Sequence, residues 1–119
     1  MCDQSLEHAR YAVLVARSKD PFGPFEDNVT GEGSNVILHG DEAWHAPGHN
    51  SVIRDDAGDD WLLYHAISDA DARRAQQTRA GWTPRIMLLE RIRYRGGWPR
   101  IANDEPSVAP LPGPLWRAP

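Results

Sequence analysis

Cysteine is almost missing from this sequence, because Cys2 is the only one among 119 residues. A single thiol excludes an intrachain disulfide framework and a zinc site built on cysteines. Long hydrophobic runs are missing as well: the longest uninterrupted apolar stretch, residues 12–16, is far too short for a membrane span or for the core of a signal peptide. The chain as written is therefore expected to remain in the cytoplasm and to have no membrane partner.

Basic residues are also fewer than acidic residues. The 13 lysines and arginines are outnumbered by 17 aspartates and glutamates, which gives a formal net charge of −4. Nucleic-acid binding depends on a basic surface that neutralises phosphates, and here the arginines are spread among acidic residues. The Gly-rich stretch at residues 31–34 lacks the Lys-Ser or Lys-Thr ending of a phosphate-binding loop. The sequence therefore predicts no nucleic-acid partner.

What the sequence does contain is a hairpin signal near its middle. Two apolar segments, one leading up to Arg54 and the other at residues 61–65, flank a turn rich in Asp and Gly at residues 55–60. Asp and Gly tolerate the backbone angles that a short chain reversal requires. The pattern predicts an antiparallel pair of strands joined by this turn.

Three further segments are expected to be strands. Residues 11–18 are rich in β-forming residues and apolar on both faces, which favours an inner strand buried between two neighbours. Residues 35–38 form a shorter strand, and residues 84–94 a strand with two different faces. One of those faces carries Ile86, Leu88, Glu90, Ile92 and Tyr94. A Gly-Gly-Trp-Pro turn at residues 96–99 then closes a second hairpin.

Two segments are not expected to be strands. Residues 68–83 could form one or two helical turns, with Ser68 as N-cap and acids in the first turn, or a variable surface loop, which we favour. From residue 105 onward the sequence holds five prolines, which favour an extended tail.

Three phrases of the sequence point to a known family. They are VARSKDPFGPFED at residues 15–27, PGHNSV at 47–52 followed by DWLLYHA at 60–66, and RIMLLERIRYRGGWPRI at 85–101. In this order they resemble the C-terminal portion of glycoside hydrolase family 43, the family of arabinanases, xylosidases and arabinofuranosidases. The resemblance covers about residues 11–107.

The resemblance implies an all-β fold, a five-bladed β-propeller of which this chain supplies only a part. Residues 1–40 would be the end of blade four, residues 41–104 blade five, and residues 105–119 an extended proline-rich tail. The sequence suggests six or seven strands, whereas five four-stranded blades need about twenty. Such a part would expose blade faces and invite self-association.

The resemblance also implies hydrolysis of arabinose- or xylose-containing polysaccharides by a longer parent enzyme, which could be secreted. Inverting glycosidases need two carboxyl groups roughly 6.5–9.5 Å apart. The family's two aspartates and its glutamate come from positions before this chain begins. The remaining acids do not match: Asp55, Asp56, Asp59 and Asp60 belong to a turn, and Glu90 to a strand. No catalytic residue is therefore assigned, and the chain alone is expected to be inactive.

Two residues match functional positions of the family. His49 matches a histidine that faces the central channel and helps to hold a metal ion or its water shell near the sugar, which implies a water-mediated calcium contact. Arg85 matches an arginine that points into the active site of xylosidases and binds substrate. From the residues alone, a hydrogen-bonded structural histidine is favoured for His49 and a sheet-face arginine for Arg85. His65 is interpreted as packing near the channel.

Two readings besides a glycosidase portion stay open. One is a non-catalytic carbohydrate-binding module that uses His49 and aromatic residues, and the other is a subunit that completes a propeller with another chain. The tryptophans could be sugar-stacking platforms, but we favour a role in filling gaps between blades. These tryptophans are Trp44, Trp61, Trp82 and Trp98.

Overall fold

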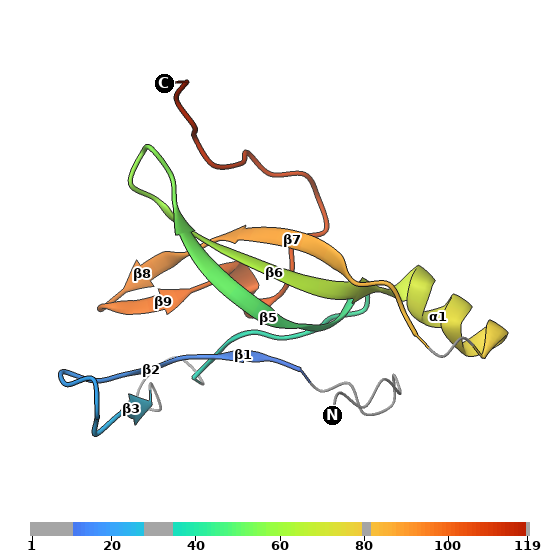
Figure 1. Ribbon diagram of the computed structural model, residues 1–119, viewed down its shortest axis with the longest axis horizontal. Helices are drawn as coiled ribbons and strands as arrows, with labels where there is room; N and C mark the ends of the chain where they lie inside the picture. The colour runs from blue at the N-terminus through green and yellow to red at the C-terminus, as the bar shows by residue number, and fades with distance from the viewer. Residues whose placement is uncertain (1–10, 28–34, 80–81, 119) are drawn as a thin grey trace.

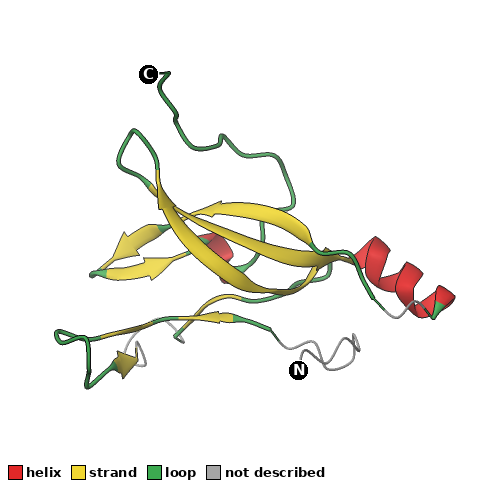
Figure 2. Ribbon diagram, viewed as in Figure 1, coloured by secondary structure: helices red, strands yellow, loops and turns green. Residues whose placement is uncertain are grey.

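The computed structural model describes residues 11–27, 35–79 and 82–118, so Cys2 and the Gly-rich loop at residues 31–34 lie outside the described ranges. Strands dominate, and the helical structure within these ranges is one α-helix and one short 3-10 helix (Figure 2). The strands are β1 (Val13–Leu14), β2 (Ala16–Arg17), β3 (Glu26–Asp27), β4 (Val36–Leu38), β5 (Trp44–Arg54), β6 (Asp60–Ser68), β7 (Ile86–Arg91), β8 (Arg93–Arg95) and β9 (Trp98–Arg100). The helices are α1 (Asp69–Thr78) and η1 (Ala102–Asp104).

A three-stranded antiparallel sheet in the order β5–β6–β7 forms the centre of the molecule (Figure 1). The predicted hairpin is confirmed, because β5 ends at Arg54 and β6 begins at Asp60, its direct partner. The second predicted hairpin is β8–β9, where Gly96 and Gly97 have φ angles of 58° and 80°, which glycine adopts at little steric cost. The remaining sheets pair β1 with β4 and β2 with β3.

Strand β6 has two different faces. Leu62, Tyr64 and Ala66 are buried at 2%, 2% and 0% exposure and point into the core. Because side chains alternate along a strand, Trp61 and His65 point to the opposite face of the sheet. The core cluster contains Val13, Ile37, Leu38, Leu62, Tyr64, Ala66, Ile92 and Ile101. It therefore joins β1 and β4 to the central sheet and to the chain segment that follows β7.

The prediction of a buried inner strand at residues 11–18 is wrong. This segment divides into β1 and β2, which pair with different partners. Val13 joins the core, but 58% of Leu14 is exposed, and Ala16 and Arg17 are exposed as well. Within the described residues each of these short strands pairs with a single neighbour, so neither is an inner strand.

The loop favoured for residues 68–83 is also wrong in its first part, where α1 is longer than the one or two turns considered. The Ser68 side chain accepts a hydrogen bond from the Asp71 N–H, which satisfies a free donor at the helix start. Asp69 and Asp71 lie in the first turn, where the helix dipole favours acids. The helix ends at Arg79, whose left-handed backbone lets its N–H donate to Ala75.

The single strand expected at residues 84–94 is interrupted, because Ile92 lies between β7 and β8 and its N–H donates to the Asp60 carbonyl. The predicted faces hold in the middle of the segment, where Glu90 and Ile92 are buried. The predicted burial of this face is wrong at the two ends of the segment, where Ile86 is 40% exposed and Tyr94 is 58% exposed.

The proline-rich tail is extended, as predicted, and it is tied to the sheet near its start. Glu90 Oε1 accepts hydrogen bonds from Ser107 N at 2.6 Å and Ser107 Oγ at 2.7 Å. The Tyr64 hydroxyl donates to the same oxygen at 3.4 Å. Burial, followed by the Glu90 charge, raises the pKa of Tyr64 far above its usual value. Glu90 is only 4% exposed, so these protein donors replace the water that its carboxylate loses on folding.

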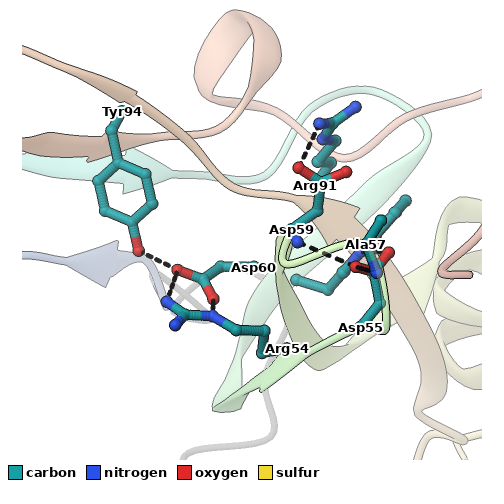
Figure 3. Close-up of polar contacts among 8 residues, drawn as sticks. Arg54, Asp55, Ala57, Asp59, Asp60, Arg91 and Tyr94 are labelled. Carbon is teal, nitrogen blue, oxygen red and sulfur yellow. Dashed lines mark hydrogen bonds and ion pairs between the residues drawn. The ribbon is translucent and has the colours of Figure 1, made fainter.

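A second attachment of the tail is the turn between β5 and β6, shown in Figure 3. Asp55 Oδ1 accepts hydrogen bonds from the N–H groups of Ala57 and Asp59, at 3.0 and 2.9 Å. Its Oδ2 accepts from Trp61 Nε1 and from the Leu115 N–H, both at 3.0 Å. The Leu115 N–H and then the other donors lower the pKa of Asp55 to about 2, against the opposing effect of desolvation. One carboxylate therefore fixes both the turn and the end of the tail.

The other acids of the turn also have structural partners. Asp60 pairs with Arg54 Nε at 2.7 Å and accepts from the Tyr94 hydroxyl at 2.6 Å (Figure 3). Arg54 first and Tyr94 second lower the pKa of Asp60 to about 2. Asp59 forms an ion pair with Arg91 on β7. These contacts bind β5, β6, β7 and β8 to one another.

The division into residues 1–40, 41–104 and 105–119 stays a prediction. Val13 and Leu38 pack in the same core cluster as Leu62, so the hydrophobic core crosses the first of these boundaries. In the part of the chain that the structure describes, there is no helix with the length and apolar character needed to cross a bilayer.

Replacement of Glu90 by alanine is expected to destabilise the fold by about 1–3 kcal/mol, because the Tyr64 hydroxyl and the Ser107 N–H lose their buried acceptor. Urea unfolding measures this loss. Glu90→Gln keeps one oxygen acceptor and should lose less stability. Glu42→Ala, at an exposed position, should be close to neutral. Equal effects of the three substitutions would contradict the role assigned to Glu90.

Asp55 is expected to make stability depend on acid pH. Its folded pKa of about 2 lies below the ordinary value of 3.8, so the unfolded chain binds more protons between these values. The stability that Asp55 contributes is present above about pH 4 and is lost as the pH falls toward 2. Thermal unfolding of Asp55→Asn should show a lower Tm at pH 7 and a weaker loss of stability between pH 4 and 2. Asp27→Asn, at an exposed strand end, is the matched control, and an unchanged acid profile for Asp55→Asn would refute the assignment.

Candidate functional site

Two bulges in β5 shape the candidate site. Between the pairs His45–Ile67 and Gly48–His65, β5 advances by three residues while β6 advances by two, and the same happens between Gly48–His65 and Ser51–Leu63. Each bulge contains one non-glycine residue with φ of 52°, Ala46 in the first and His49 in the second. A bulge changes the direction of side chains and carbonyls, and such features often lie beside functional sites.

Gly48 lies between the two bulges and packs closely on Tyr11. A Cβ at position 48 would lie 3.1 Å from Tyr11 Cδ1, so any larger residue here would push against the aromatic ring. The Arg85 guanidinium carbon is 5.8 Å from the centre of the same ring, within the range of a cation–π contact. The Tyr11 ring therefore contacts both the bulged strand at Gly48 and the Arg85 guanidinium.

The structure brings the two predicted site residues together through His65. Arg85 Nε donates to His65 Nδ1 at 2.5 Å, and Arg85 Nη2 donates to the Ala46 carbonyl in the first bulge. The imidazole of His49 stacks on that of His65, with ring centres 5.3 Å apart and an angle of 16° between the planes. Figure 1 shows the β5 and β6 strands that carry them side by side. We refer to His49, His65, Arg85 and Tyr11 as the His–Arg cluster.

His65 is held as a neutral imidazole. Desolvation, then the positive charge of Arg85, and to a smaller extent His49 lower the pKa of His65. Because a guanidinium can only donate, Nδ1 of His65 must be the acceptor, and the proton of the neutral ring is then on Nε2. The cluster thus presents one permanent positive charge and an imidazole N–H donor.

This arrangement suits binding rather than acid–base catalysis by a pair of carboxyl groups. The residues of the His–Arg cluster include no carboxylate, and the acids considered from the sequence have other partners. Asp55 and Asp60 hold the turn, and Glu90 holds the tail. Guanidinium and imidazole N–H groups can donate hydrogen bonds to sugar hydroxyls or to a carboxylate supplied by another part of a protein.

Direct calcium binding does not fit this cluster. Calcium prefers six to eight oxygen ligands, whereas His49 has an imidazole and a guanidinium as neighbours. Across residues 11–27, 35–79 and 82–118, no group of three or more His, Cys, Asp or Glu side chains is arranged to hold a metal ion. The water-mediated contact through His49 stays a prediction.

Other aromatic residues mainly pack, as favoured from the sequence. Trp61 is 6% exposed and Trp44 packs against the core. Trp98 is half-buried and stacks with the Arg17 guanidinium at 4.1 Å. Trp82 differs, with 67% of its surface exposed.

Sequence reasoning missed two members of the cluster. The sequence predicts packing for His65, although this residue accepts the Arg85 hydrogen bond, and it predicts only a strand position for Tyr11. The register between β6 and β7 could have suggested the first, because His65 pairs with Met87, two residues from Arg85. No pattern in the sequence marks the contact with Tyr11, which is distant along the chain.

Comparison of the sequence with known proteins identifies one family and a similar enzyme. The sequence model of a family described as "Glycosyl hydrolases family 43" matches residues 3–99, well over half of the chain. An extracellular exo-α-(1→5)-L-arabinofuranosidase of Cellvibrio japonicus is 29% identical over 100 residues. That match covers 80% of this chain and 26% of the arabinofuranosidase.

A solved structure resembles the fold. The crystal structure of a xylan β-1,4-xylosidase from Bacillus halodurans matches with a TM-score of 0.59 and 18% identity, over 93% of this chain and 22% of the xylosidase. The chain thus spans about a quarter of the length of these relatives, and its strands form part of a β-propeller, as predicted. On the match of its family model, the chain belongs to glycosyl hydrolase family 43.

Proposed function

We propose that this chain forms the C-terminal part of the propeller of a glycosidase that hydrolyses arabinose- or xylose-containing polysaccharides. In this proposal it supplies substrate-binding groups, and the catalytic carboxylates lie outside the chain. The names of an arabinofuranosidase and a xylosidase among its relatives support this class of substrate. The extracellular relative supports secretion of the parent enzyme.

The observation that carries the proposal is the convergence of His49 and Arg85 on one imidazole. These two residues are 36 positions apart, and the family resemblance names both of them. Arg85 is hydrogen-bonded to His65 and to the Ala46 carbonyl, while His49 stacks on His65. Fixed donors of this kind can orient a sugar, because little side-chain freedom is left to lose when the ligand binds.

A second candidate function is a carbohydrate-binding module without hydrolysis. The observation that favours it is the lack of a carboxylate within the His–Arg cluster. Inverting hydrolysis needs an acid and a base on opposite sides of the sugar, and a guanidinium cannot act as either at neutral pH. A water-mediated calcium contact through His49 would be compatible with both candidates.

Sugar binding at the cluster can be tested by NMR titration of the 119-residue chain with α-1,5-linked arabinotriose and with β-1,4-linked xylotriose. We expect shifts of the His49, His65 and Arg85 signals with at least one of them. Arg85→Gln should weaken binding about tenfold or more, because a charged hydrogen-bond donor is lost. Arg79→Gln, at the end of α1, removes the same charge elsewhere and should not weaken it. No hydrolysis of either trisaccharide by the chain alone is expected.

The same spectra provide a control that does not involve sugar. The His65 ring should titrate below its ordinary pKa of 6.5, and Arg85→Gln should raise that pKa because the nearby positive charge is gone. If the pKa of His65 rises but neither trisaccharide binds, the cluster is built as described and has no role in sugar binding. Hydrolysis by the isolated chain would contradict the placement of the carboxylates outside it.

Self-association through exposed blade faces is a further prediction. Large apolar side chains are exposed on several elements, among them Leu14, Phe25, Val52 and Met87, at 56–71% exposure. Such surface drives association in water. Light scattering after size exclusion should give a mass above that of the monomer, increasing with protein concentration, and Met87→Lys should reduce it. A compact monomer at all concentrations would contradict the prediction.

A further inference from the structure

A partly open cavity of about 380 Å³ lies between the central sheet and the proline-rich tail. It is separate from the His–Arg cluster, which lines none of it. The strands contribute Trp61, Leu89, Arg91 and Arg93, and the tail contributes residues such as Pro112 and Leu115. The hydrogen bonds of Asp55 and Asp56 to Leu115 hold the tail in place as one wall.

The strand register explains why two arginines line this cavity. Leu89, Arg91 and Arg93 alternate with the buried residues Glu90 and Ile92, so they share the face turned away from the core. Arg91 pairs directly with Trp61 across the sheet, which places both on that face. Neither arginine takes part in the proposed sugar site.

The charges lining the cavity, from two aspartates and two arginines, sum to zero, but only one aspartate and one arginine form an ion pair with each other. Asp55 already accepts four N–H donors, and Asp59 pairs with Arg91 at 2.5 Å, as Figure 3 shows. Among the described residues, the Arg93 side chain has no hydrogen bond or ion pair, although its backbone pairs with Arg100 in the β8–β9 hairpin. Its guanidinium therefore lines the cavity as a positive charge that makes no ion pair.

We propose that this cavity binds a sugar residue that carries a carboxylate, a uronate, within the polysaccharide. Arg93 would form paired hydrogen bonds with the carboxylate, and the Trp61, Leu89 and Pro112 wall would contact the apolar face of the sugar ring. The kind of polymer rests on the proposed function.

The cavity and the His–Arg cluster are close enough for one ligand to contact both. Trp61 and His65 are four residues apart on the same face of β6, which corresponds to roughly 13 Å along the strand. A short oligosaccharide can cover such a distance. The two sites would then recognise different groups of one chain, neutral hydroxyls at Arg85 and a carboxylate at Arg93.

The test is an NMR titration of the 119-residue chain with sodium glucuronate, and with glucose at equal concentration as the neutral control. We expect glucuronate, and not glucose, to shift the signals of Arg93, the Trp61 indole and Gly113. Arg93→Gln should weaken this binding about tenfold or more, while Arg79→Gln should leave it unchanged. Position 79 follows α1, at the opposite end of the molecule from β8 (Figure 1). The Arg93 side chain has no described partner and is exposed, so its replacement should not affect folding.

The outcomes separate this inference from the proposed function. Equal shifts with glucose, or an unchanged affinity in Arg93→Gln, would overturn the uronate site even if trisaccharides bind at Arg85. Glucuronate binding that survives Arg85→Gln and is lost in Arg93→Gln supports the cavity independently of the cluster. An acidic peptide that occupies the cavity when glucuronate does not would show a protein segment to be its ligand, and the proposal would be wrong.

Discussion

The alternation of side chains along β6 is the constraint on which the rest of the structure depends. β6 has hydrogen-bonded partners on both edges, so its register is fixed from two sides. Leu62, Tyr64 and Ala66 must then occupy the core, and a shift by one residue would bury His65 in their place. The opposite face consequently carries Trp61 at one end and His65 further along. Both candidate binding regions follow from this one division.

Buried carboxylates of the chain are used to hold this sheet in place. Asp55 and Glu90 each accept several hydrogen bonds, and each binds part of the proline-rich tail as well as its own surroundings. Asp60 is held between Arg54 and Tyr94. Asp55 and Asp60 are poor general bases, because the same hydrogen bonds that stabilise their charge lower their pKa and reduce their affinity for a proton. These three acids thus contribute to the stability of the sheet.

Local chemistry accounts for what could be predicted from the sequence. The Asp and Gly residues of the β5–β6 turn, the alternation in β6, and Ser68 as a helix N-cap are each determined by neighbours in the chain, and the resemblance to the family supplied the propeller. The bulges at Ala46 and His49 could not be predicted, because they depend on how β5 fits against β6 and Tyr11. The docking of Leu115 on Asp55 was also missed, since it joins residues sixty positions apart.

The bulges also explain how the Arg85 side chain is held in one position. A regular β5 would place Ala46 and His49 on opposite faces by simple alternation, with no carbonyl directed at Arg85. The extra residue in each bulge lets the Ala46 carbonyl accept from Arg85 while His49 stacks on His65. Arg85 is then fixed at two points and cannot fold back onto the acids of its own chain. A guanidinium held in this way is ready to pair with a sugar or a carboxylate that comes from outside these residues.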